Sequence, residues 1–243
     1  MSNRDGRLVT ALADVTFSVN AGEYLCLLGR SGCGKSTLLS VISGLTELDA
    51  GTIRNNGELV CGPNRHRMLM FQQDALFPWL DVLGNVMYGL QFVERMSRDE
   101  MQKKAEAYLD LVGLSNVHHF HINQLSGGMR QRVALARALA PDPNILLMDE
   151  PFSALDAMTR EQLYADMQRI WKETQKTVIM VTHNAREAAC LGTRIILMSA
   201  GRVIDDQPIS LPHPRTMNDT GIGQTASLIS QRLQQKENVE SIQ

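Results

Sequence analysis

The 243-residue sequence lacks several features that would assign it to a class at once. No stretch approaches the roughly 18 consecutive apolar residues that a membrane-spanning helix needs. Residues 1–7 carry no apolar core of a secretory leader. The four cysteines (Cys26, Cys33, Cys61 and Cys190) show no C-x-x-C spacing, which favours free thiols in a reducing compartment over disulfides or a zinc site.

An excess of charge of one sign is also missing. Lysine and arginine number 24 against 26 aspartates and glutamates, giving a formal net charge of −2. Because a nucleic-acid-binding domain usually carries a basic excess, this balance argues against a nucleic acid partner. The hydrophobic share is 44%, which suits one α/β domain, or a core with a subdomain, around a sizeable core.

The sequence does contain a phosphate-binding loop pattern, G-x-x-x-x-G-K-[ST], in Gly29, Arg30, Ser31, Gly32, Cys33, Gly34, Lys35, Ser36 and Thr37. An apolar run at 24–28 predicts a buried strand before it, and the run 38–42 predicts a helix after it. Glycines let backbone N–H groups face one anion, and the helix start adds partial positive charge. Lys35 can reach the β- and γ-phosphates, and Ser36 can ligate Mg²⁺. The correct flanks argue against the alternative of a glycine turn that binds nothing.

Strands alternating with helices along the chain predict a largely parallel sheet. Buried strands are expected at 144–148, 178–182 and 195–198, and residues 8–28 alternate in places. Between glycines, residues 46–70 predict a small antiparallel strand region that ends at Met68-Leu69-Met70-Phe71.

Helical patterns dominate from about residue 84 to 140, which predicts an α-helical subdomain. Ser97 to Glu100 reads as a capping box, and Gly113 ends the apolar stripe that follows. A second helix is expected between 127 and 140, and a third carries the stripe Leu163, Met167, Ile170 and Trp171. The polar tail, about 215–243, is expected to fray.

Two carboxylates, Asp149 and Glu150, follow the apolar run of the expected strand at 144–148. An α/β sheet binds its ligands at the carboxyl ends of its strands. Asp149 is therefore a candidate for holding Mg²⁺, and Glu150 for accepting a proton from an attacking water. The alternative is that two acids simply begin a surface loop, which is less expected behind a phosphate loop.

A second candidate anion site is Ser126, Gly127 and Gly128 at the start of the helix over 127–140. One chain then carries two phosphate-type helix starts, and one solution is that two copies face each other around each nucleotide. By itself, the triplet is more often an ordinary serine-capped helix.

Taken in order, the phosphate loop, Leu125 to Gln131, Asp149-Glu150, Ser153 to Asp156 and Thr182-His183 resemble the motifs of an ATP-binding cassette (ABC) ATPase, and Phe71-Gln72-Gln73 resembles that family's glutamine loop. The resemblance covers nearly the whole chain. It implies a single ABC ATPase domain over 1–243: a RecA-like P-loop NTPase core, mostly parallel, with a small antiparallel β region and an inserted α-helical subdomain. Leu76 to Trp79, Met129 and Pro151 to Asp156 are similar to the importer ATPases for nitrate, sulfonate and taurine.

The resemblance also implies a role for each matching residue, with ATP and Mg²⁺ as the cofactors. Residues Gly29 to Thr37 would cradle the triphosphate, and Ser36, Gln72 and Asp149 would serve Mg²⁺. Glu150 would be the general base, with Lys35, Gln72 and His183 completing the catalytic set. The resemblance assigns nucleotide contacts across a dimer to Ser126, Gly127, Gly128 and Asp156.

The partners implied are a second copy or a related ABC subunit, transmembrane permease subunits, and indirectly an external solute-binding protein. The chain would lie at the cytoplasmic face of the inner membrane and power the import of a small solute. Leu76, Phe77, Pro78 and Trp79 would then help form the groove for a permease helix; local burial of these residues is an equal alternative.

Two other functions stay open at this point. One is a soluble ABC ATPase of translation or DNA repair, although such proteins usually carry two cassettes or a long coiled-coil insertion. The other is a truncated nucleotide-binding module without turnover. It stays open because Gly6 or its neighbours stand where the family usually has an aromatic residue that stacks on adenine. Asn184 also stands where an Asp commonly follows the histidine.

Overall fold

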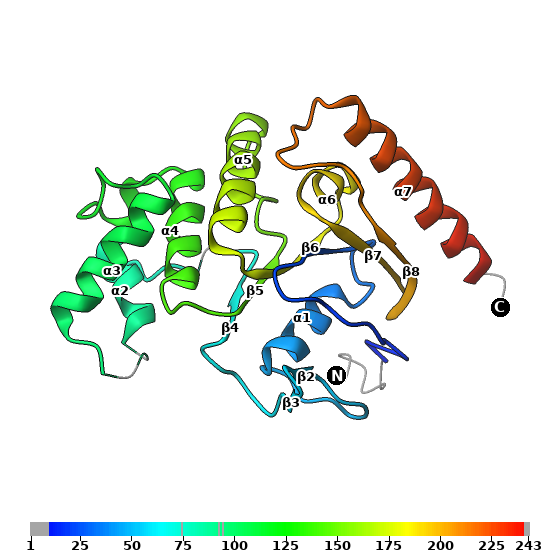
Figure 1. Cartoon of the computed structure of the whole chain (residues 1–243), viewed down its shortest axis with the longest axis horizontal. Helices are drawn as coiled ribbons and strands as arrows, with labels where there is room; N and C mark the ends of the chain where they lie inside the picture. The colour runs from blue at the N-terminus through cyan, green and yellow to red at the C-terminus, as the bar shows by residue number, and fades with distance from the viewer. Residues whose placement is uncertain (1–9, 74, 92, 94, 241–243) are drawn as a thin grey trace. The chain divides into compact units, whose positions relative to one another are not determined.

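The computed structural model describes residues 10–73, 75–91, 93 and 95–240, and Figure 1 shows its helices and strands. The chain divides into two compact units. The first unit comprises residues 1–62 and 179–243, and the second comprises residues 63–178. Strand β6 (Thr177–Thr182) begins in the second unit and ends in the first.

The first unit is built on strands in the order β6-β1-β7-β8. Strand β1 pairs with β7 in parallel, and β7 pairs with β8 in antiparallel register. A separate antiparallel hairpin, β2–β3, follows the first helix. The bounds are β1 Tyr24–Leu28, α1 Lys35–Ser43, β2 Arg54–Asn55, β3 Glu58–Leu59, α6 Ala185–Leu191, β7 Arg194–Ser199, β8 Arg202–Pro208 and α7 Thr220–Glu240.

The core of this unit follows from two uninterrupted apolar runs. All five residues of β1 are buried, as are Ile195–Met198 in β7. Such runs are typical of parallel strands that are covered on both faces. Helix α1 ends at Gly44, whose φ of 84° and close approach to the Gly62 backbone leave no room for a side chain. Helix α6 packs against β1 and against α7.

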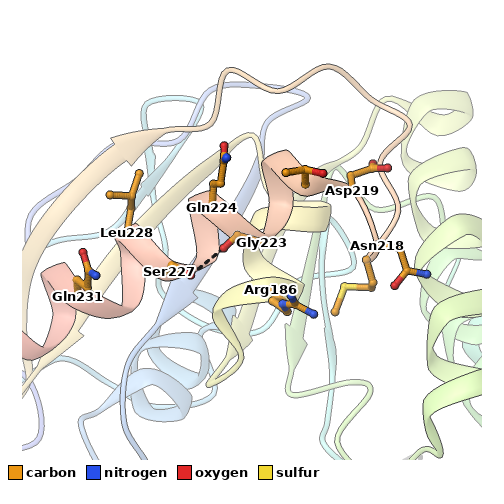
Figure 2. Close-up of a pocket in the computed structure, with 10 residues that line it drawn as sticks. Arg186, Asn218, Asp219, Gly223, Gln224, Ser227, Leu228 and Gln231 are labelled. Carbon is orange, nitrogen blue, oxygen red and sulfur yellow. Dashed lines mark hydrogen bonds between the residues drawn. The ribbon is translucent and has the colours of Figure 1, made fainter.

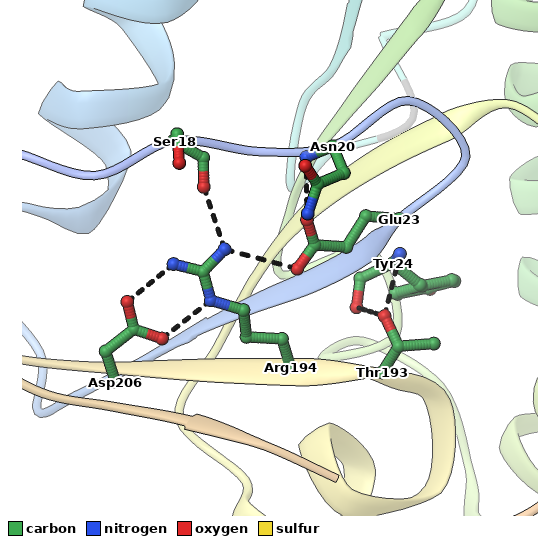
Figure 3. Close-up of polar contacts among 7 residues, drawn as sticks. All are labelled: Ser18, Asn20, Glu23, Tyr24, Thr193, Arg194 and Asp206. Carbon is green, nitrogen blue, oxygen red and sulfur yellow. Dashed lines mark hydrogen bonds and ion pairs between the residues drawn. The ribbon is translucent and has the colours of Figure 1, made fainter. Parts of the chain in front are cut away.

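The guanidinium of Arg194 joins three segments at the start of β1 (Figure 3). It donates to both carboxylate oxygens of Asp206, at 2.6 and 2.5 Å, and so ties β7 to β8. It also donates to the Ser18 carbonyl at 2.8 Å and to the Glu23 carboxylate at 3.3 Å. The turn that leads into β1, and hence into the phosphate loop, is therefore fixed to the neighbouring strand.

In its described residues, the second unit combines a parallel strand pair with five helical segments. Strand β4 pairs with β5, with Met70 opposite Met148. Helices α2, α3 and α4 pack against one another, and α4 also contacts β4 and α5. The bounds are β4 Arg67–Met70, α2 Val82–Leu90, α3 Arg98–Leu111, a short 3-10 helix Ile122–Gln124, α4 Gly127–Leu139, β5 Ile145–Asp149 and α5 Ala157–Thr174.

Most of the expected elements are present. The Ser97–Glu100 capping box starts α3, Gly113 follows its end with a φ of 75°, and all four cysteines are free thiols. Strands at 145–149, 177–182 and 194–199, and helices at 127–139 and 157–174, lie where the pattern predicts them.

Two expectations are wrong. Residues 67–70 do not end an antiparallel region but pair in parallel with β5, and the antiparallel pairing in this stretch is the β2–β3 hairpin and a single bridge between Asn64 and Arg67. The tail does not fray throughout, because residues 220–240 form α7. The N-terminal prediction around Gly6 lies outside the described residues.

Candidate active site

The phosphate loop lies between β1 and α1, in the first unit. Gly34 caps α1 with a φ of 101°, and Gly32 has a φ of 82°, backbone conformations that favour glycine. A Cβ on Gly29 would lie 2.3 Å from the Met198 carbonyl oxygen, and one on Gly34 would lie 2.5 Å from that of Ala11. The glycines of the motif are therefore required by the curled loop and by the chain packed against it.

Lys35 is the first residue of α1, and the residue is only 4% exposed. Its ammonium donates to the carbonyls of Gly29 (2.7 Å) and Arg30 (2.8 Å) and lies 3.8 Å from the Cys33 sulfur. The cation is thus held over the loop at the N-terminus of α1, where the helix partial charge is also positive. Ser36 is exposed in the same turn. Together these groups form a positive cradle that suits phosphate.

The two acids lie at the end of β5 in the second unit. Asp149 is the last residue of the strand, and Glu150 turns the chain sharply with a φ of 43°. Because Met70 is opposite Met148, Gln72 and Glu150 both lie two residues beyond a paired position at the same sheet edge. The structure connects them through Ser153. Its hydroxyl donates to the Glu150 carbonyl at 3.0 Å and accepts from the Gln72 amide at 3.4 Å.

Ser126, Gly127 and Gly128 start α4 as expected, with the Ser126 hydroxyl accepting the Met129 N–H at 3.3 Å. A Cβ on Gly128 would lie 2.4 Å from the Thr159 methyl group, so this glycine lets α4 approach α5. Asp156 caps α5 by accepting the Thr159 N–H at 3.0 Å. That bond holds the pKa of Asp156 below its usual value. The structure therefore brings the start of α4 and the Asp156 loop together.

His183 is exposed directly after β6, in the same unit as the phosphate loop. Asn184, which follows it, caps α6 by accepting the N–H groups of Arg186 (3.0 Å) and Glu187 (3.3 Å). An asparagine performs this capping role as well as an aspartate does. The departure from the family pattern at this position therefore leaves the start of α6 intact.

A groove of about 770 Å³, which sequence analysis did not anticipate, lies between α6 and α7. Figure 2 shows Arg186 of α6 beside Gly223 and Ser227 of α7. A neighbouring hollow along the same helices reaches His183 and Asn184. No sequence signal marked this groove, because α6 and α7 were not expected as helices.

The donors that would serve Mg²⁺ are a hydroxyl, a carboxylate and an amide, from Ser36, Asp149 and Gln72. These are hard oxygen ligands, and Mg²⁺ usually takes only one or two carboxylates together with phosphates and waters. Within the described ranges, no three His, Cys, Asp or Glu side chains gather into a metal cluster. In their chemistry, these oxygen donors fit Mg²⁺.

Comparison with known proteins identifies the class that this fold and these motifs define. The family model described as ABC transporter matches residues 12–153. A taurine import ATP-binding protein of Pelagibacter ubique is 48% identical over 197 residues, covering 80% of this chain and 73% of that protein. The chain belongs to the ABC transporter family. Its fold is accordingly that of the ABC ATPase cassettes, and it is an ATP hydrolase.

Solved structures agree with this assignment. A dimeric bacterial ABC transporter cassette is similar at a TM-score of 0.75 and 35% identity, with 84% of this chain and 93% of that chain covered. A dimeric post-hydrolysis state of such a cassette, bound to ADP and inorganic phosphate, gives a TM-score of 0.74 at the same identity and coverage. In the part of the chain that the structure describes, no helix is long and apolar enough to cross a membrane.

Proposed function

We propose that this chain binds and hydrolyses MgATP between two paired cassettes and so powers the import of a small sulfonate, taurine or a close relative, through a separate membrane permease. The observation that carries this proposal is that one chain offers two helix starts built for phosphate, at α1 and at α4. Similarity to taurine import ATP-binding proteins supports import over a soluble non-transport ATPase.

In this proposal the residues divide the work as follows. The loop Gly29–Thr37 binds the triphosphate, with Lys35 supplying positive charge, and Ser36, Asp149 and Gln72 serve Mg²⁺. The start of α4 and Asp156 of one copy meet the nucleotide bound by the other. His183 contacts the γ-phosphate, and Glu150 accepts the proton of the attacking water. When bound, Mg²⁺ neutralises the charge that develops on the phosphates.

Glu150 suits the role of base because its neighbours fix its backbone at the end of β5. The Ser153 hydroxyl and N–H both bind the Glu150 backbone carbonyl, at 3.0 and 3.2 Å. Its left-handed backbone sets its side-chain direction apart from that of Asp149. General base catalysis contributes roughly 10²–10⁴-fold to a rate. Loss of this carboxylate should therefore cost turnover and leave nucleotide binding in place.

A surface suited to the permease follows Gln72 along the chain, in the same unit. Trp79 is 73% exposed, and Phe77 stacks with it and with Tyr88 at ring distances of 5.3 and 4.4 Å. The loop is rigid, because the buried Asn85 amide both donates to the Phe77 carbonyl and accepts its N–H. An exposed aromatic cluster on a fixed loop is typical of a protein-binding surface, here at the cytoplasmic face of the inner membrane.

Glu150→Gln tests the proposal by size exclusion and ATPase assay. The variant should shift to a dimer when ATP is added and should hydrolyse ATP about 10²–10⁴-fold more slowly. Glu161→Gln, the same change at an exposed position on α5, is the matched control and should keep full turnover. Normal turnover in Glu150→Gln would remove this residue as the base. A monomer that persists in ATP would contradict the pairing.

The solute is decided by a second measurement. The permease is the membrane protein that co-purifies with this chain, together with its external binding protein. Vesicles that contain the whole assembly should hydrolyse ATP faster in the presence of taurine. Stimulation by nitrate alone would contradict a sulfonate as the solute.

A further inference from the structure

Two polar side chains that flank His183 in the sequence, Thr182 before it and Glu187 after it, are buried to an extent that requires an explanation. Thr182 is 1% exposed and Glu187 is 6% exposed. The Thr182 hydroxyl and the Glu187 carboxylate are hydrogen-bonded to each other across the first turn of α6. The other buried residues of that helix, Ala188, Ala189, Cys190 and Leu191, are apolar. Burial of an acid there is costly unless its hydrogen bonds compensate.

The hydroxyl of Thr182 also accepts the N–H of Asn184 at 3.0 Å. Asn184 in turn accepts the N–H groups of Arg186 and Glu187. The residues on both sides of His183 are therefore held by one continuous network, while the imidazole itself is exposed. This network fixes the backbone from which the histidine projects.

Glu187 determines which groups donate and which accept in this hydrogen-bond network. A hydroxyl has a single proton to donate, whereas an ionised carboxylate only accepts. Because the Thr182 proton goes to Glu187, the Thr182 oxygen presents its lone pairs to the N–H of Asn184. An apolar residue at 187 would leave the hydroxyl free to rotate, and the Asn184 N–H would lose its defined acceptor.

The surroundings hold Glu187 in this arrangement. The Cys26 thiol on β1 faces the same region, and its pKa is raised, first by burial and then by the negative charge of Glu187. The neighbouring thiol therefore stays neutral, and it is a weak donor that competes poorly for the carboxylate. Arg215 is also near Cys26, where its positive charge acts on the thiol in the opposite direction.

We propose that Glu187 and Thr182 are positioning residues of the reaction: the carboxylate orients the Thr182 hydroxyl, which fixes the turn that aims His183 at the γ-phosphate. This inference rests on the proposed role of His183. Because Thr182 and Glu187 are both buried, they would act on turnover through His183. The buried pair is thus a device for catalysis in addition to a stabilising contact.

The experiment measures kcat and KM for ATP in Thr182→Val, Thr182→Ser, His183→Ala and the double variant Thr182→Val/His183→Ala. Valine keeps the shape of threonine and removes the hydroxyl. We expect Thr182→Val to lower kcat about tenfold or more, with KM changed less than twofold, and Thr182→Ser to stay within twofold of the unmutated chain. The double variant should be no slower than His183→Ala, because both changes remove one function.

Other outcomes distinguish a failure of this inference from a failure of the proposed function. If His183→Ala loses turnover and Thr182→Val does not, the positioning role is refuted and the proposed function stands. If the two single losses of kcat multiply in the double variant, the positioning role is also refuted, because independent structural effects multiply. Full turnover in His183→Ala would overturn the role of His183 itself. If Thr182→Val does not fold, Glu187→Gln is measured instead, because its amide can donate to Thr182 and reverse the bond; unchanged kcat there refutes the inference.

Discussion

Replacing Arg194 by methionine should destabilise the first unit and leave the chemistry of the phosphate loop unaltered. Methionine keeps most of the apolar stem and removes every donor of the guanidinium. Four hydrogen bonds are lost, two to Asp206 and one each to Ser18 and Glu23. The bond with Asp206 is the main reason that the pKa of Arg194 lies above its already high ordinary value, so this side chain is charged at every accessible pH.

The size of the effect follows from the burial of the partners. The side chains of Arg194, Glu23 and Asp206 are 20%, 10% and 37% exposed, so the network lies between a surface pair and a buried one. Surface pairs contribute about 0–1 kcal/mol, and breaking a buried pair costs about 3–5 kcal/mol. We expect a loss of about 3 kcal/mol, because removal also leaves the Glu23 carboxylate without its cation. At about 2–4 °C per kcal/mol, the melting temperature should fall by about 6–12 °C.

Urea unfolding followed by far-ultraviolet circular dichroism measures this loss. Both tryptophans, Trp79 and Trp171, belong to the second unit, so their fluorescence serves as an internal comparison. Arg202→Met is the matched control. Its partner Asp14 is 86% exposed, and the change should cost under about 0.5 kcal/mol. If Arg194→Met costs no more than this control, the network does not stabilise the strand that leads into the phosphate loop.

Three further changes test the remaining parts of the molecule. Lys35→Ala should weaken ATP binding at least about tenfold in a nucleotide titration, since one hydrogen bond to a charged group contributes about 1.5–3 kcal/mol; tight binding would contradict the loop assignment. Ser126→Arg should spare binding by the monomer but block ATP-dependent pairing, and an unchanged ATPase rate would exclude the start of α4 from the site. Burial, and then the charge of Arg215, lower the pKa of His213 to about 4 from 6.5, so the unfolded chain takes up this proton first as the pH falls. Unfolding free energy should therefore drop by about 1–2 kcal/mol, after allowance for solvent screening, between pH 7 and pH 4, and His213→Gln should lose that part of the pH dependence.

Sequence patterns predicted the elements whose cause is local. A few neighbouring residues are enough to determine the phosphate loop, the Ser97 capping box and the unbroken apolar strands. Residues 67–70 were assigned to the wrong sheet partner because pairing is decided by β5, which lies about 75 residues further along the chain. Residues 15–19 alternate but form no strand, because alternation alone cannot supply a partner.

For the site, the motifs predicted which residues matter but not how neighbours hold them. The link from Gln72 through Ser153 to Glu150 depends on the parallel register of β4 and β5, which the sequence does not display. Glu187 was missed because a single acid in a short helix looks like a solvated one. Its burial appears only when α6 is packed on β1.

Because of the contact between Gly128 and Thr159, the effect of a substitution at one of these positions depends on the residue at the other. The atom that excludes a side chain at 128 is the threonine methyl group, 2.4 Å from where a Cβ would stand. Serine at 159 would keep the backbone N–H that caps onto Asp156 and would remove that methyl group. Gly128→Ala should therefore be far less harmful in a chain that already carries Thr159→Ser. The residue at position 159 of α5 thus determines whether α4 requires a glycine at position 128. In evolution, Gly128→Ala would be accepted only after Thr159→Ser.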